Sequence, residues 1–311
     1  MSGMGGPTAD NAVAVIVTLQ PERDVIHHAE ALIGQVARIV VIDNGSDPGA
    51  GPILDSLSKL PSIELIRNPV NAGIARALNQ GAQAAMDVGA EWLLTLDQDA
   101  APSPEIVRIA GHTFQAYPQP QRIAVIGSTS TADLAQSTGP ASRGRPWIQA
   151  STVITAGSFV SLAAFRSIGG FREDFFVDYH DIEFCLRARA RGYRVLVSRE
   201  LALTHRIGQP TVRWIGRRAV VTTNHSATRR YYMTRNRFLV WRRYWRTDPR
   251  YVAEDIIASE KELAKLLLVE EDRVGKLRAV LAGMTDGIRG ITGTRGSASG
   301  RRFGTRRTPR L

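Results

Sequence analysis

Short apolar runs alternate with segments of helical periodicity over the first hundred residues, and this rhythm constrains the fold more than any other feature. The apolar runs predict strands at residues 13–18, 38–43, 63–67 and 91–96, and the helical patterns between them span about 24–36, 53–60 and 73–88. A strand–helix–strand order of this kind predicts an α/β fold, with a mixed, mostly parallel sheet that has helices on both faces. Ligands of such sheets bind at the carboxyl ends of the strands.

The pattern becomes less regular after residue 100. Further strands are predicted at residues 123–127, 158–162 and 193–197, with a helix at 181–191 and a Ser/Thr/Gly-rich loop at 129–146. From residue 213 the chain is basic and helical, with an amphipathic stretch over 252–282. We therefore predict a disordered N-terminus over 1–11, an α/β domain over 12–212, a basic helical region over 213–289 and a disordered, arginine-rich tail over 290–311.

Charge and cysteine content limit the class of protein. Cys185 is the only cysteine, which rules out an intrachain disulfide and favours the reducing cytoplasm. No apolar run reaches the roughly 18 residues that cross a membrane, and the first residues do not form a signal peptide. The net charge is +11, and residues 201–311 hold 24 of the 40 Lys and Arg residues but only 9 of the 29 acids. Such a region favours phosphates, anionic lipid headgroups or nucleic acid as partners.

The second apolar run ends in the sequence Ile-Asp-Asn-Gly-Ser, which places Asp43 and Asn44 at a strand end. A carboxylate there can accept a hydrogen bond from a ribose hydroxyl or from the N3–H of a pyrimidine base. A dinucleotide-binding domain also needs a glycine-rich turn after the first strand, but Thr18 is followed by Leu-Gln-Pro-Glu-Arg. NAD binding is therefore disfavoured, as is a P-loop, and a plain turn remains the alternative for Asp-Asn-Gly.

The fourth apolar run ends in Leu-Asp-Gln-Asp, so that Asp97 and Asp99 point to the same side of the chain. A divalent metal, a basic side chain or solvent must offset their repulsion. Carboxylate oxygens suit Mg²⁺ or Mn²⁺, which combine one or two carboxylates with phosphate oxygens. A phosphatase of the D-x-D-x-[TV] type is disfavoured because its motif follows a first strand and continues with Thr or Val, whereas two alanines follow Asp99. A solvated strand end is the simpler alternative.

Two more segments carry candidates for chemistry. Five acids lie between residues 173 and 183, and Asp178 or Asp181 would begin the helix predicted at 181–191, either as a cap or as a general base for a hydroxyl. His205 follows a strand and is either structural or a metal ligand. The sequence also has Gly73 directly before a predicted helix, where free N–H groups suit a phosphate or simply close a loop.

Arginines alternate with aromatic residues over Ser226–Tyr244. This composition is typical of a surface that binds phosphate or nucleic acid. We take Arg230, Tyr231, Arg235 and Asn236 as candidates for binding an acceptor or a phosphate. The alternative is a basic helix packed on the rest of the protein, with the arginine stems covering apolar surface.

The order of these segments is more specific than any one of them. The chain runs IDNGS, N-x-G-I-A-x-A-x-N, LDQDA, AGSFVSLAAFRSIGGFREDFF and HDIEFCLRARARGY before a lone histidine. This succession resembles the family 2 glycosyltransferases of the GT-A fold, and most of all their bacterial rhamnosyltransferase branch, over about residues 12–240. The resemblance implies an inverting, metal-dependent transfer of a sugar to a saccharide or lipid-linked acceptor in cell-envelope polysaccharide synthesis. L-rhamnose from dTDP-rhamnose is the leading donor.

The resemblance also implies roles for matching residues. Asp43 would read the pyrimidine base and Asn44 would contact the nucleotide-sugar, Asp99 and His205 would bind Mg²⁺ or Mn²⁺, and Asp181 would be the catalytic base. Glu183 would stand beside the base at the acceptor, and the remaining donor contacts would come from Thr18, Gly73, Ile74, Asn79, Asp97 and Gln98. The chain departs from the family in Thr18-Leu19-Gln20-Pro21, where T-x-N-R is usual, and in His180, where an acid usually precedes the base.

Two other classes of protein share some of these features. A nucleotidyltransferase has a similar sheet and paired acids but binds a nucleoside triphosphate. A nucleic-acid-binding protein would use the basic last third, with binding that depends steeply on salt, although we expect no nucleic acid partner. An anionic membrane surface is a further expected partner of the basic region. The sequence leaves open whether the chain is a monomer or a homo-oligomer.

Overall fold

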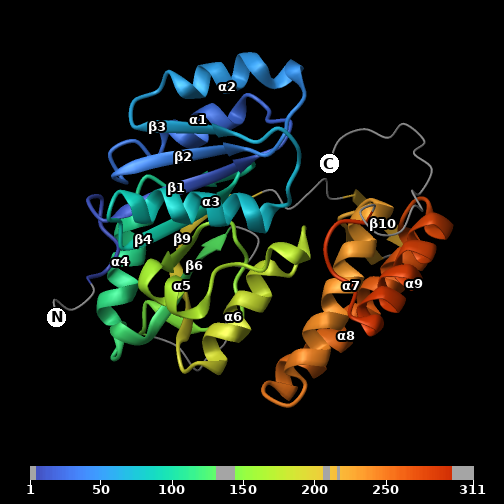
Figure 1. Ribbon diagram of the computed structural model, residues 1–311. Coiled ribbons are helices and arrows are strands. Elements are labelled where there is room, and N and C mark those ends of the chain that lie inside the picture. The colour runs from blue at the N-terminus through green and yellow to red at the C-terminus, as the bar shows by residue number, and fades with distance from the viewer. Residues whose placement is uncertain (1–4, 131–143, 206–210, 216–217, 296–311) are drawn as a thin grey trace. The chain divides into compact units, whose positions relative to one another are not determined.

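The computed structural model describes residues 5–130, 144–205, 211–215 and 218–295 (Figure 1). Its contacts divide the chain into an N-terminal unit, residues 1–171 and 181–206, and a C-terminal unit, residues 172–180 and 207–311. The segment 172–180 was predicted as part of the α/β domain, but it packs with the C-terminal unit instead.

The N-terminal unit is built on a mixed sheet with the strand order β3-β2-β1-β4-β8-β6-β9-β5 and with β7 paired to β9. Strands β1 to β4 run parallel, whereas β8 is antiparallel to both β4 and β6. The strands are β1 Ala12–Thr18, β2 Arg38–Asp43, β3 Ile63–Arg67, β4 Trp92–Asp97, β5 Ala100–Pro102, β6 Ile123–Ser130, β7 Trp147–Gln149, β8 Ser158–Ser161 and β9 Arg194–His205. The mixed, mostly parallel sheet predicted from the sequence is confirmed.

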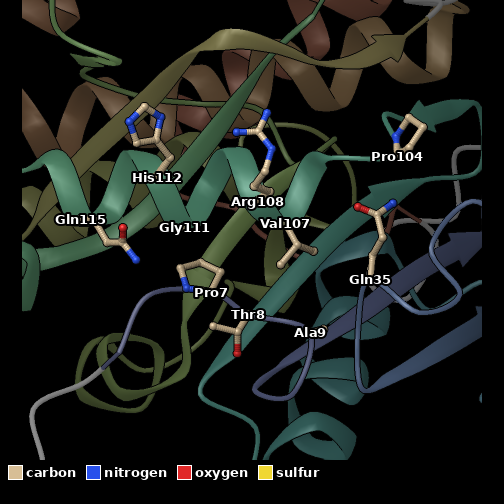
Figure 2. Close-up of a pocket in the computed structure, with 10 residues that line it drawn as sticks. All are labelled: Pro7, Thr8, Ala9, Gln35, Pro104, Val107, Arg108, Gly111, His112 and Gln115. Atoms are coloured by element: carbon tan, nitrogen blue, oxygen red, sulfur yellow. The ribbon is translucent and has the colours of Figure 1, made fainter.

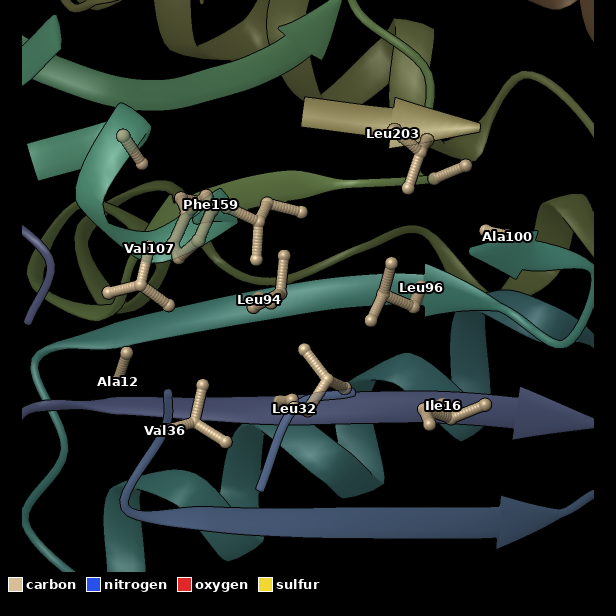
Figure 3. Packing of buried hydrophobic residues seen from close by; sticks show 14 of the residues in the cluster. Ala12, Ile16, Leu32, Val36, Leu94, Leu96, Ala100, Val107, Phe159 and Leu203 are labelled. Atoms are coloured by element: carbon tan, nitrogen blue, oxygen red, sulfur yellow. The ribbon is translucent and has the colours of Figure 1, made fainter. Parts of the chain in front are cut away.

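Helices cover both faces of this sheet, and side chains of the central strands alternate between the two layers. Ala12, Ala14 and Ile16 of β1 pack with α1, α2 and α4, and Figure 3 shows part of this cluster around β1 and β4. Val13 and Val15 point to the other face, toward α3, α5 and α6. The period of two with both faces buried is expected for parallel strands between helices. The helices are α1 Asp24–Glu30, α2 Gly51–Ser58, α3 Ile74–Asp87, α4 Ile106–Ala116, α5 Leu162–Ile168 and α6 His180–Ala190.

Helix α3 lies close to the sheet because its contact face is made of small residues. A Cβ atom on Gly81 would lie 2.5 Å from the Cγ atoms of Val15 on β1, so only glycine fits there without movement. Ala75, Ala77, Ala82 and Ala85 are also buried. This close packing fixes the start of α3, at Gly73 and Ile74, relative to the ends of the central strands.

Three helices and a hairpin form most of the C-terminal unit. The helices are α7 Ala227–Tyr244, α8 Pro249–Val269 and α9 Arg273–Arg289, and the hairpin pairs β10 Thr211–Ile215 with β11 Arg218–Thr222. Helix α9 approaches α7 closely through Gly283, where a Cβ would lie 2.5 Å from the carbonyl oxygen of Tyr231. Residues 213–215 and 218–222 were predicted to be helical, and this is wrong because the β-branched Ile215, Val220, Val221 and Thr222 favour extended backbone. Within the residues described, no helix is long and apolar enough to cross a membrane.

Part of the predicted N-terminal disorder is also wrong. Residues 5–11 are placed against the sheet, where the indole of Trp92 donates to the carbonyl of Gly5 at 2.9 Å. Near the other end, the N–H of Arg295 donates to the hydroxyl of Tyr232 at 2.9 Å. The predicted tail from 296 onward and the loop over 131–143 lie outside the described residues.

A buried ion cluster ties the C-terminal unit together and gives a stability prediction. Glu270 is 2% exposed and accepts from Thr222, Arg230 and Lys276. Burial opposes ionisation of this carboxyl, but the hydrogen bonds from Thr222 and Lys276 and the charge of Arg230 outweigh it, and its pKa lies below the ordinary value. We expect Glu270→Gln to lower the free energy of unfolding by about 3 kcal/mol, because two buried cations lose their carboxylate. Urea unfolding followed by tryptophan fluorescence measures this loss.

The pH dependence of that loss has a defined sign. A carboxyl whose folded pKa is lowered stabilises the fold above its unfolded pKa of 4.5, and this contribution disappears as the pH falls through the folded value. The difference between wild type and Glu270→Gln should therefore shrink below pH 4.5. As a control, Glu254→Gln removes an exposed i,i+4 pair with Arg250 and should leave stability nearly unchanged, because water screens such a pair. Equal effects of the two variants would contradict the prediction.

Candidate active site

The carboxyl ends of three adjacent parallel strands bring the first site residues together. Thr18, the last residue of β1, is in register with Asp43 of β2, and Val17 is in register with Asp97 of β4. Thr18 is fully buried, and its Oγ1 has no hydrogen-bond partner among the described residues. A buried hydroxyl without a partner is destabilising, so a ligand at this edge of the sheet would satisfy it.

The loop after β2 is held in place by the polar residues predicted to bind the donor. Asp43 accepts from the N–H of Ser46 at 3.3 Å and from its hydroxyl, which is the turn that the Asp-Asn-Gly sequence predicted as an alternative. Asn44 accepts from the N–H of Ala72 at 3.1 Å. Gly45 has a φ of +87°, and a Cβ there would lie 2.5 Å from the carbonyl carbon of Val70. Asp43 and Asn44 therefore join the loop after β2 to the loop before α3.

The loop before α3 presents its backbone at the same edge of the sheet. Gly73 has a φ of +89°, and its N–H donates to the side chain of Asn71 at 2.9 Å. Ile74 is the first residue of α3 and is partly exposed. Both residues lie at the edge of the sheet where ligands of such folds bind, and their contact with a donor stays a prediction.

The turn that carries the two aspartates is anchored from two directions through Gln98. Its side-chain Oε1 accepts from the N–H of Leu19 at 2.8 Å, and its carbonyl accepts from Nδ1 of His28 at 2.9 Å. Asp97 is partly buried and Asp99 is exposed. The sequence offered no signal for His28, because its partner is a backbone carbonyl 70 residues away.

His205 is placed beside this turn by backbone pairing. Strand β5 begins at Ala100, directly after Asp99, and Ala100 is in register with His205 of β9. The side chain of His205 lies outside the described part of the structure. The pairing nevertheless brings its backbone next to the Asp97–Asp99 turn, as the metal-binding prediction requires.

Asp181 at the start of α6 is connected to the same strand by a short chain of hydrogen bonds. Its Oδ1 accepts from the N–H of Ile182 at 2.8 Å and its Oδ2 from the N–H of Thr155 at 3.2 Å. The carbonyl of Thr155 accepts from the hydroxyl of Thr95 at 2.7 Å, and Thr95 lies on β4 two residues before Asp97. Both threonines were missed from the sequence, where a hydroxyl inside the apolar run of β4 was the only signal.

Asn79 and Glu183 make structural contacts on α3 and α6. Asn79 donates to the carbonyl of Phe171 and accepts from its N–H, both at 2.9 Å. Glu183 is 1% exposed and pairs with Arg187, which also donates to the carbonyls of Ile168, Gly169 and Gly170. A ligand-binding role for either residue would require it to leave these partners, so those roles stay predictions.

The four candidates on α7 are buried in the C-terminal unit. Arg230 pairs with Glu270, and the Tyr231 hydroxyl donates to Asp286 at 2.7 Å. Arg235 and Asn236 are 1% and 0% exposed and bind backbone carbonyls. These contacts favour the alternative of a packed basic helix over an open phosphate-binding surface, and the predicted acceptor role is without support from them.

The residues at the carboxyl edge suit a divalent cation. In the described part of the chain, no three or more His, Cys, Asp and Glu side chains are grouped so that they could hold a metal ion by themselves. Mg²⁺ and Mn²⁺ do not need such a cluster, because one or two carboxylates plus diphosphate oxygens complete their coordination. The exposed Asp99 next to Asp97 therefore fits a metal that arrives with its substrate.

Two other features can be set apart from this site. Burial raises the pKa of the Cys185 thiol to about 12, so this cysteine is not a nucleophile.

A cavity of about 450 Å³ lies between α4 and the residues before β1, lined by Thr8, Gln35, Arg108 and His112 among others (Figure 2). Residues 7–9 and Gln35 precede β1 and β2, which places this cavity at the amino ends of the strands, opposite the candidate site.

Comparison with known proteins identifies a family domain in the first half of the chain. The profile of the family described as "Glycosyl transferase family 2" matches residues 15–162, from β1 to the start of α5. Residues 15–162 are a glycosyltransferase family 2 domain. The matched range holds the carboxyl ends of β1, β2 and β4, and this glycosyltransferase therefore has its family's signature where the structure gathers the site residues.

One relative is similar over nearly the whole length of this glycosyltransferase. It is 28% identical over 306 residues to the "dTDP-rhamnosyl transferase RfbF" of Shigella flexneri, which covers 91% of this chain and 97% of the relative.

Solved structures confirm the GT-A fold. TarS 1-349 of S. aureus in complex with UDP-GlcNAc matches with a TM-score of 0.57 at 14% identity, over 90% of this chain and 81% of that one. The mannosyltransferase PcManGT of Pyrobaculum calidifontis, in complex with GDP-Man and Mn²⁺, matches with a TM-score of 0.54 at 13% identity, over 89% of this chain and 87% of that one.

Proposed function

We propose that this glycosyltransferase transfers L-rhamnose from dTDP-rhamnose to an acceptor hydroxyl, with inversion at the anomeric carbon. The donor is supported by the similarity to a dTDP-rhamnosyl transferase over 91% of the chain. The observation that carries the mechanism is the hydrogen-bond chain from Asp181 through Thr155 and Thr95 to the strand that ends in Asp97. It links one carboxylate base, at the start of α6, to the strand that leads to the paired acids, and a single base with a single displacement inverts the configuration.

Each group at the edge of the sheet then has a chemical task. Asp43 and Asn44 contact the base of the nucleotide, and the buried Thr18 hydroxyl contacts the nucleotide beside them. The backbone at Gly73 and Ile74 completes the donor pocket. Asp181 takes the proton of the acceptor hydroxyl while its oxygen attacks the anomeric carbon, and general-base help of this kind is worth roughly 10²–10⁴-fold in rate. Positioning of donor and acceptor supplies much of the remaining acceleration.

Asp99 and His205 would hold Mg²⁺ or Mn²⁺, with Asp97 beside them. When bound, such a cation neutralises the negative charge of the departing diphosphate. Among the solved structures with this fold, PcManGT is in complex with Mn²⁺.

The acceptor would be a saccharide or a lipid-linked saccharide of the cell envelope. A cytoplasmic location is supported by the single, buried cysteine, and contact with an anionic membrane by the basic last third. Several of its arginines are used inside the C-terminal unit, but Arg242, Arg243 and Arg246 are exposed and available to anionic headgroups.

Thermal unfolding with a panel of nucleotide sugars tests the proposed donor. A ligand that binds only the folded protein raises its stability, by about 2.7 kcal/mol at a concentration of 100 Kd. With Mg²⁺ or Mn²⁺ present, dTDP-rhamnose should raise the Tm, and UDP-GlcNAc and GDP-mannose should not. Stabilisation by a nucleoside triphosphate alone would instead favour a nucleotidyltransferase.

A further inference from the structure

The segment just before Asp181 has an unusual backbone. Three of its non-glycine residues have a positive φ: Phe176 at 64°, Asp178 at 59° and Tyr179 at 66°. Phe176 has a ψ of −63°, and the N–H of Val177 donates to the carbonyl of Phe175 at 2.8 Å, which together make a γ-turn of the rare, strained kind. Residues with side chains rarely adopt these conformations, and they persist only where surrounding groups hold them.

One side chain of α7 holds most of this backbone. The amide of Asn236, which is fully buried, donates to the carbonyls of Phe175 at 2.9 Å, Val177 at 2.8 Å and Asp178 at 3.0 Å. Its Oδ1 in turn accepts from Nε of Arg235 at 3.0 Å. The two hydrogens of this amide nitrogen are shared among three carbonyls, which converge on one donor group. No smaller side chain can replace it.

The neighbours of Asn236 on α7 bind the rest of the segment. Arg235 donates to the carbonyl of Asp174 at 3.2 Å, and its guanidinium stacks on the Tyr232 ring at 4.8 Å. Arg229 binds the Asp178 carboxylate with two hydrogen bonds, at 3.0 and 2.8 Å. Bidentate pairs of this kind fix orientation as well as position.

The hydroxyl of Tyr179 completes the set of anchors. It donates to Asp255 on α8 at 3.0 Å and accepts from Nε of Arg237. The segment is therefore held at Asp174, Phe175, Val177, Asp178 and Tyr179.

The link from this segment to the proposed base is covalent. Tyr179 is followed by His180, the first residue of α6, and then by Asp181. The last left-handed residue therefore lies two positions before Asp181, where the chain enters α6. We propose that Asn236, supported by Arg229 and Arg235, is a positioning residue for catalysis that acts on Asp181 through the chain. This inference rests on the proposed role of Asp181 as the base.

A double-mutant cycle in the full-length protein separates this role from a merely structural one. Asn236→Ala should lower kcat on the order of 10- to 100-fold, since small displacements of a catalytic group have effects of this size. The Kd for dTDP-rhamnose, measured by calorimetry, should stay within about twofold. In an Asp181→Asn background the same substitution should change kcat by less than about twofold, because the group it positions is already inactive.

Arg229→Gln provides a second cycle that holds if Asn236→Ala fails to fold, because Arg229 is partly exposed and its removal leaves the buried Asn236 contacts in place. Thr228→Ala, at an exposed residue of the same helix, is the control and should leave kcat unchanged. An unchanged kcat in the folded Asn236→Ala or Arg229→Gln variant, or full additivity with Asp181→Asn, would overturn the inference. Retained transfer in Asp181→Asn alone would instead refute the proposed base, and the single variant shows this separately.

Discussion

Asp181→Asn should lower kcat for sugar transfer by about 10²–10⁴-fold, the usual value of a general base, and should leave donor affinity unchanged. The amide has the size of the carboxylate and can still accept one of the two N–H groups, from Ile182 or Thr155, that the carboxylate accepts now. It cannot take a proton from the acceptor hydroxyl. Transfer is measured as release of dTDP, and donor binding by calorimetry with the same protein.

The neighbouring acid on the same helix is the control for this prediction. Glu183→Gln weakens the buried pair with Arg187, which holds the carbonyls of residues 168–170, and should therefore lower the Tm. Its effect on kcat should be far smaller than that of Asp181→Asn. The base assignment would be wrong if Asp181→Asn transferred sugar at the wild-type rate, or if only Glu183→Gln lost transfer.

The strands of the first half of the chain could be predicted because their signal is local. Strands β2 and β3 have the predicted bounds, since each apolar run is flanked by polar or turn residues. Helix α5 was not predicted because it follows β8 directly. The helix has only seven residues, and apolar residues continue from the strand into it, so the sequence shows no clear helical period. Ser161 ends the strand and caps the helix, so the change of structure depends on one hydrogen bond.

The candidate site was predictable to the extent that topology decides it. Thr18, Asp43 and Asp97 come together because the carboxyl ends of parallel strands share an edge, and the sequence shows each residue at a strand end. Contacts between distant segments could not be predicted. The contact of His28 could not be predicted for this reason. The arginines of α7 were predicted to form a ligand-binding surface because composition does not show whether an arginine faces solvent or a buried partner.

Asp99→Ala should remove the metal-dependent part of donor binding, on the order of 10²-fold in affinity, since the cation contributes several kcal/mol when it neutralises phosphate charge. Asp99 is exposed, so we expect its replacement to change the stability of the fold by no more than about 0.5 kcal/mol. A loss of binding therefore reports on the site and not on unfolding. The measurement is calorimetry with dTDP-rhamnose in Mn²⁺ and again in EDTA.

The comparison with an exposed acid beside the site makes this prediction specific. Asp47 lies in the turn after β2, and its side chain caps no helix, so Asp47→Ala changes local charge by the same amount as Asp99→Ala. If the aspartate pair binds the cation, EDTA should weaken donor binding to wild type and to Asp47→Ala, and should leave the weak binding to Asp99→Ala unchanged. The substitution leaves the anchors of Gln98 intact, so the turn should keep its structure in Asp99→Ala. If this protein still responded to Mn²⁺ like wild type, the cation would have to be held elsewhere.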